Sequence, residues 1–88
     1  MESEQTELWV VERYLPCASP LRLARLVADT RVAARDTPGL AYLGSVAVPA
    51  DEMCFCVFAA ASAGAVEDLV MRVDVGFLRI VDAVAATA

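Results

Sequence analysis

The sequence has no histidine and no lysine, and only four glycines and four prolines among its 88 residues. Without histidine the chain lacks the commonest general base and the commonest metal ligand. So few glycines and prolines exclude a collagen-like or Gly/Pro-rich chain. A Gly-rich phosphate loop, a Ser-His-Asp set and a spaced acidic cluster for a hard cation are also missing. We expect no cofactor and no metal, and whether the chain is an enzyme stays open.

The sequence also shows no cluster of basic residues and no targeting signal. The net charge is −5, and the seven basic residues, all arginines, are scattered along the chain. This pattern argues against a nucleic-acid partner. Charged residues interrupt every apolar run before the ~20 residues that cross a bilayer. The acidic start, Met-Glu-Ser-Glu-Gln-Thr-Glu, has no feature of a signal peptide. Three cysteines without framework spacing suit a reducing compartment, so we expect a cytoplasmic protein with no membrane partner.

Apolar residues, by contrast, are in excess. They make up 59% of the chain, and the mean hydropathy is +0.58. A chain of 88 residues is one domain with a small core, which cannot absorb so much apolar surface. The excess favours self-association.

Hydrophobic periodicity predicts six elements in the order βαββαβ. Strands are expected over residues 8–15, 40–48, 53–60 and 77–84. Ser19, followed by Pro20, and Ser62 are typical helix N-caps, so a helix is expected after each. We expect residues 1–6 to be a flexible acidic tail and residues 7–85 to form a single domain.

Two interleaved right-handed βαβ units give an α+β, ferredoxin-like fold. It has a four-stranded antiparallel sheet with two helices on one face. The other face is bare, yet the strands are apolar on both sides, as at Val10 and Val11 or Phe55 and Cys56. A second copy is the usual cover for such a face. We therefore expect a homodimer in which the two sheets form a dimeric α/β barrel.

The few polar residues inside the strands are the candidates for function. Glu12 with Arg79, and Arg13 with Asp82, have the register parity to meet across the first and last strands. They are either structural ion pairs, or one pair lines the space between the sheets. There Glu12 would act as a base and Arg79 would hold an anionic group. The tyrosines combine stacking area with one polar handle. The predicted ligand-binding residues are Glu12, Tyr14, Tyr42, Cys56 and Arg79.

Cys54 and Cys56 lie on one face of their strand. Their Cα atoms would be ~6.5–7 Å apart, which is at the edge of disulfide geometry. They are either small buried hydrophobes beside Phe58, or two soft ligands that a two-fold axis doubles into a four-thiolate zinc site. Cys17, near a helix start, has the position for a lowered thiol pKa but no His or second Cys beside it.

Several stretches together resemble a small bacterial family of unknown function that includes a nickel-binding member. They are Val11-Glu12-Arg13-Tyr14-Leu15-Pro16, Tyr42-Leu43-Gly44-Ser45, Asp51-Glu52-Met53-Cys54-Phe55-Cys56-Val57-Phe58 and Gly76-Phe77. The resemblance implies a ferredoxin-like chain that forms a dimeric α/β barrel whose interior accepts a small ligand. The nickel-binding relative has histidines near the positions of Gly44 and Met71, and this chain has none. Its nickel site is therefore not implied here, and only Cys54 or Cys56 could replace it.

Three functions follow as hypotheses. The first is a dimeric protein that binds a small, partly apolar molecule between its sheets. The second is a cofactor-free monooxygenase, cyclase or isomerase using Glu12, Tyr14, Tyr42 and Arg79, which rests on analogy of fold. The third is a soft-metal (nickel, zinc or copper) protein using Cys54 and Cys56.

Overall fold

The computed structural model describes residues 7–16, 19–73 and 76–86. Its elements are β1 (Glu7–Tyr14), α1 (Pro20–Arg35), β2 (Ala41–Val48), the 3-10 turn η1 (Pro49–Asp51), β3 (Met53–Ala60), α2 (Ala63–Arg72) and β4 (Arg79–Ala83). This confirms the predicted order βαββαβ. The expected acidic tail, residues 1–6, and the candidate thiol Cys17 lie outside the described residues. No helix in the described ranges is long and apolar enough to span a membrane.

Both helices begin at the predicted serine caps. Ser19 Oγ accepts a hydrogen bond from the backbone N–H of Arg22 at 3.1 Å, and Ser62 Oγ accepts one from Ala65 at 3.2 Å. Pro20 occupies the first turn of α1, where its missing N–H costs nothing. These local signals fix where each helix starts.

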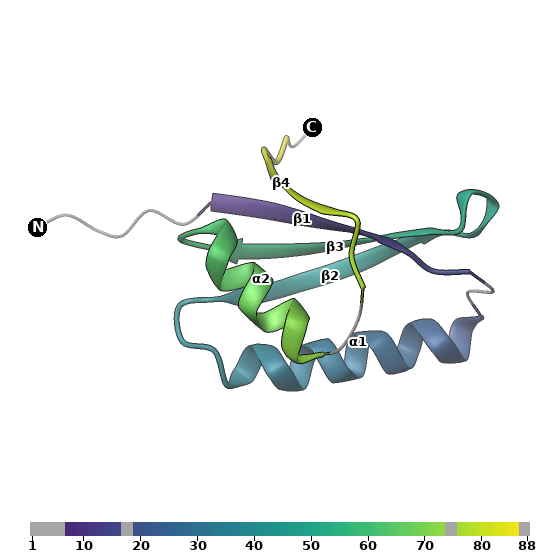
Figure 1. Cartoon of the computed structure of the whole chain (residues 1–88), viewed down its shortest axis with the longest axis horizontal. Helices are drawn as coiled ribbons and strands as arrows, with labels where there is room; N and C mark the ends of the chain where they lie inside the picture. Colours follow the sequence, from purple (N-terminus) through teal and green to yellow (C-terminus); the bar gives the residue numbers. More distant parts are fainter. Residues whose placement is uncertain (1–6, 17–18, 74–75, 87–88) are drawn as a thin grey trace, which may run out of the picture.

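The four strands form one antiparallel sheet in the order β2-β3-β1-β4 (Figure 1). β4 is shorter than predicted, because regular pairing with β1 begins only at Arg79. The backbone N–H of Leu78 still donates to the carbonyl oxygen of Glu12 at 2.7 Å. β2 contains a bulge between Tyr42 and Gly44, which changes its register against β3.

Both helices cover the same face of this sheet. The core joins Leu26 of α1 and Val66, Leu69 and Val70 of α2 to the side chains that β1 and β3 direct toward them. Those strand residues are Val11, Cys54, Cys56, Phe58 and Ala60, and each is at most 2% exposed. The arrangement confirms the predicted ferredoxin-like α+β fold.

The alternate side chains of the strands form the opposite surface, which we call the open face. The register aligns them in rows: Ala41, Ala59, Leu8 and Ala83; Gly44, Val57, Val10 and Val81; Val46, Phe55, Glu12 and Arg79; and Val48, Met53 and Tyr14. No described helix contributes to this face. Its apolar side chains are exposed or half-buried, and Val46 is 60% exposed.

Candidate functional site

The open face is apolar over two rows and becomes polar at one end. In the third row Arg79 Nε lies 3.0 Å from Glu12 Oε2, and these side chains are 66% and 18% exposed. The predicted pairing of Glu12 with Arg79 is therefore confirmed. In the fourth row the Tyr14 hydroxyl donates to Glu52 Oε1 at 2.8 Å. Three of the five predicted ligand-binding residues thus share one end of the open face.

A shallow hollow of about 350 Å³ lies where β2 bulges. It is lined by Leu43, Gly44, Ser45, Val46 and Val57. Gly44 has φ +142°, a conformation that residues with a side chain rarely adopt, and a Cβ built there would meet no atom within 4 Å. The glycine therefore serves the bulge geometry and leaves the hollow open. An apolar group of a small molecule would find room here.

Tyr42 and Cys56 lie on the other side of the sheet, under the helices. Ser45 Oγ donates to Cys56 Sγ at 3.1 Å, so the Tyr42 hydroxyl is the donor in its short contact with Ser45 Oγ. The Tyr42 ring packs on Phe58 with the ring centroids 5.2 Å apart. Burial raises the pKa of the Tyr42 hydroxyl, and the hydrogen bond with Ser45 opposes that effect. The five predicted ligand-binding residues are therefore divided between two faces.

The two described cysteines are buried free thiols, as one of the two alternatives from the sequence had it. Burial raises the pKa of Cys54 from 9.0 to about 11, with neighbouring Cys56 contributing, so it is a thiol and not a thiolate at neutral pH. Both sulfurs lie on the helix-covered face, so a two-fold axis at the open face does not bring four of them together. Within residues 7–16, 19–73 and 76–86, no three metal-binding side chains form a cluster.

The second predicted ion pair does not form. The register places Asp82 opposite Trp9, while Arg13 lies opposite Cys54. Arg13 and Asp82 have the same parity, as expected, but they are at different heights in the sheet. β4 ends its regular pairing at Glu12 and Arg79, so no β4 residue pairs with Arg13.

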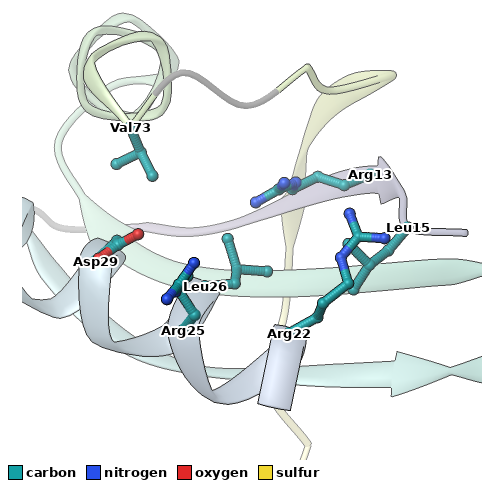
Figure 2. Close-up of a pocket in the computed structure, with 7 residues that line it drawn as sticks. All are labelled: Arg13, Leu15, Arg22, Arg25, Leu26, Asp29 and Val73. Carbon is teal, nitrogen blue, oxygen red and sulfur yellow. The ribbon is translucent and has the colours of Figure 1, made fainter. Parts of the chain in front are cut away.

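A second candidate site, which was not predicted from the sequence, lies on the helix-covered side of the sheet (Figure 2). A pocket of about 260 Å³ lies between α1, the end of β1 and Val73 at the end of α2. It is lined by Arg13, Leu15, Arg22, Arg25, Leu26, Asp29 and Val73. Two signals could have found it. Arg13 shares one face of its strand with the apolar residues Val11 and Leu15, and Arg22 and Arg25 are three apart on one face of a helix.

Comparisons with known proteins support the fold. No family model matches the chain, and no curated protein matches it. Among solved structures, the protein SCO4226 from Streptomyces coelicolor A3(2) is similar with a TM-score of 0.80. It is 15% identical in sequence, and the similarity covers 91% of this chain and 99% of that one. At this identity the likeness establishes a small ferredoxin-like fold found in bacteria and no activity.

Proposed function

We propose that two copies of this chain pack open face to open face, and that the space between their sheets binds a small, partly apolar molecule. The observation that carries the proposal is the uncovered apolar surface formed by the rows of Val10, Val57 and Val81 and of Leu8 and Ala59. Contiguous apolar surface of this kind marks an interaction site, and a symmetric partner offers it the same surface in return.

The polar end of the open face defines the chemistry of the proposed ligand. The Arg79 side chain is largely exposed beside Glu12, and Tyr14 presents a phenol in the next row. A molecule with an apolar body and one acidic or hydrogen-bonding group would place its body near Val46 and Val57 and its polar group near Arg79. Tyr42 and Cys56 stay outside this proposed site, since the sheet separates them from it.

Native mass spectrometry of untagged protein tests both parts of the proposal in one spectrum. We expect a species at twice the 9.4 kDa of the chain, with additional mass from a co-purified small molecule. A dimer without added mass would retain the assembly and remove the support for a tightly held ligand. A monomer at micromolar concentration would overturn the proposal.

A matched pair of substitutions assigns the interface. Val46 on the open face and Val32 on α1 are 60% and 56% exposed, so lysine at either position is tolerated by the single chain. Val46→Lys should convert the dimer to monomers and release any bound molecule, because it places charges inside the interface. Val32→Lys should leave the dimer intact. Equal effects of the two variants would contradict an interface at the open face.

No specific observation favours the other two hypotheses. An enzyme using Glu12, Tyr14, Tyr42 and Arg79 would need these side chains on one surface, and the sheet lies between Tyr42 and the other three. A soft-metal site would need Cys54 and Cys56 to reach further ligands, and both are buried among core residues. We expect the dimer to act in the cytoplasm, where a reducing environment keeps these thiols free.

A further inference from the structure

Arg13 is a buried charge with no ion-pair partner among residues 7–16, 19–73 and 76–86. It is 3% exposed, and its buried Nε atom has no hydrogen-bond partner in these ranges. The ion pair between Glu12 and Arg79 is on the other face, and no described carboxylate lies within 4.0 Å of the Arg13 guanidinium. A guanidinium stays charged at all ordinary pH values, so it cannot relieve its desolvation by losing a proton. A buried cation of this kind requires an acceptor.

Two more arginines face the same pocket. Figure 2 shows the Arg13 guanidinium extending from β1 toward the space above Leu26, with Arg22 and Arg25 rising from α1 below it. Arg22 is held in place because its Nη1 donates to the carbonyl oxygen of Pro16 at 2.7 Å, which leaves its other N–H groups available. The backbone N–H groups at the capped start of α1 add positive potential. No acidic residue occupies the first turn of α1.

Among the described residues that line this pocket, Asp29 is the only carboxylate, and one carboxylate does not neutralise three guanidinium groups. Its side chain lies at the far end of the pocket from Arg22, and it makes no ion pair within the described residues. The described lining of the pocket therefore combines three cations with one anion, in a chain whose net charge is −5. An excess of local positive charge against an acidic background indicates a site for an anion.

We propose that this pocket binds the oxyanion group of a small molecule, with Arg13, Arg22 and Arg25 as its ligands. Guanidinium groups match phosphate and carboxylate through paired N–H donors, and a bound oxyanion would supply the acceptor that Arg13 lacks. A second hollow of about 320 Å³ shares Arg13, Leu15 and Arg22 and continues past Phe77 and Leu78. It has the apolar lining to hold the rest of the molecule. The arginine pocket lies on the helix-covered side, whereas the second hollow also reaches Tyr14 at the polar end of the open face.

Titration of the full chain, followed by calorimetry and amide NMR shifts, tests the site. The probes are inorganic phosphate, phenyl phosphate and benzoate at constant ionic strength, which keeps nonspecific screening equal. We expect saturable binding, with shifts concentrated at residues 20–29 and 77–78, and tighter binding of phenyl phosphate than of phosphate. The comparison of phenyl phosphate with benzoate decides which head group is preferred. Absence of saturable binding for all three probes would overturn the proposal.

Variants at exposed positions keep the test independent of folding. Arg22→Ala and Arg25→Ala should each weaken binding by about tenfold or more, as expected for charged hydrogen bonds. Arg31→Ala, on the same helix but outside the pocket, should leave affinity unchanged. Asp29→Asn should tighten binding by removing the opposing charge. If Arg31→Ala weakened binding equally, the anion would be responding only to the general charge of the helix. If Arg22→Ala and Arg25→Ala did not weaken binding, these side chains would not be ligands. Either result would contradict the assigned site.

Discussion

The two faces of the sheet have similar apolar residues and opposite surroundings. On the helix-covered face, Val11, Cys56 and Phe58 are 0–2% exposed. On the open face, the neighbours of these residues along the same strands, such as Val10 and Val57, remain half-buried. The described part of the chain covers only the first of these faces, since both helices pack on it. The difference between the faces is what supports the proposed second copy over the open face.

The charged residues of the two faces also differ. The open face holds a matched ion pair, Glu12 and Arg79, near solvent. The helix-covered face holds Arg13, which is buried and unmatched among the described residues. A pair in solvent needs no further explanation, whereas a buried single charge does. Each face therefore supports its own proposal: a second copy over the open face, and an oxyanion beside Arg13.

The largest expected difference between the faces concerns two phenylalanines of β3. Phe58 is 1% exposed under the helices, while Phe55 lies half-buried on the open face. Phe58→Ala should lower the free energy of unfolding by about 3–5 kcal/mol, since it leaves a cavity in the core. Phe55→Ala should cost about 1–2 kcal/mol in a monomer. Urea unfolding monitored by circular dichroism measures both.

Protein concentration sharpens this comparison. If the open face is an interface, the cost of Phe55→Ala should rise with protein concentration, because burial of Phe55 then depends on association. The cost of Phe58→Ala should not change in this way, since its packing is within one chain. If the loss of unfolding free energy in Phe55→Ala did not depend on protein concentration, the proposed packing of a second copy on the open face would be contradicted.

The next expected effect is a loss of stability at high pH through Cys54. The pKa of this thiol is raised to about 11 in the folded chain by burial and by Cys56, so the folded state keeps a proton that the unfolded state loses above pH 9. Stability should therefore be complete below pH 9 and fall as the pH rises through 11, by roughly 2–3 kcal/mol. Unfolding free energies at pH 8, 9, 10 and 11 measure the slope.

A variant without the thiol isolates this effect from other groups. The pKa of Tyr42 is also raised by burial, so its ionisation destabilises the fold in the same direction. Cys54→Ala should lower stability at pH 8 through lost packing, but should show a shallower decline between pH 9 and 11. An unchanged slope would assign the decline to Tyr42.

Removal of the buried charge at Arg13 should raise the stability of the fold, in contrast to the changes described above. Arg13→Met keeps an unbranched chain of similar reach among Leu15, Leu26 and Val73 and removes the unpartnered cation. In buffer free of phosphate and carboxylate, stability should rise by about 1–2 kcal/mol, because an unsatisfied buried polar group costs that much. Thermal unfolding measures the rise, and added phenyl phosphate should stabilise the unmodified protein more than this variant. A destabilised variant would show that Arg13 already has a structural partner.

Local signals in the sequence were enough to predict the order of the elements. Ser19 with Pro20, and Ser62, are caps whose geometry depends on a few neighbouring residues. The apolar run over residues 53–60, which follows the polar turn of residues 49–52, predicted β3 with its observed bounds. The register of Glu12 against Arg79 followed from parity and an antiparallel neighbour. In each case the deciding interactions lie close together in the chain or follow from the two-residue period of a strand.

Which residues come together in each site could not be predicted from the strand pattern alone. Strand alternation shows that Glu12 and Arg13 point to opposite faces, but it does not show which face the helices cover. That choice depends on how α1 and α2 pack. It decides that Tyr14 belongs to the open face and Cys56 to the core. The arginine pocket depends on the same packing, since it joins β1, α1 and α2.

The smallest expected effect is at the ion pair of the open face, and its size reports whether that face is covered. In a monomer the Glu12–Arg79 pair is partly in solvent and should contribute only about 0.2–1 kcal/mol, decreasing with added salt. A double-mutant cycle of Glu12→Gln and Arg79→Ala measures this coupling. Under a second sheet the same pair would lose solvent, so its coupling should exceed the monomer range and resist salt. The cycle should therefore be run in the unmodified background and in Val46→Lys, where the face is expected to be uncovered. Equal, salt-sensitive coupling in both backgrounds would mean that Glu12 and Arg79 face water in the native protein, which argues against burial of this end of the open face.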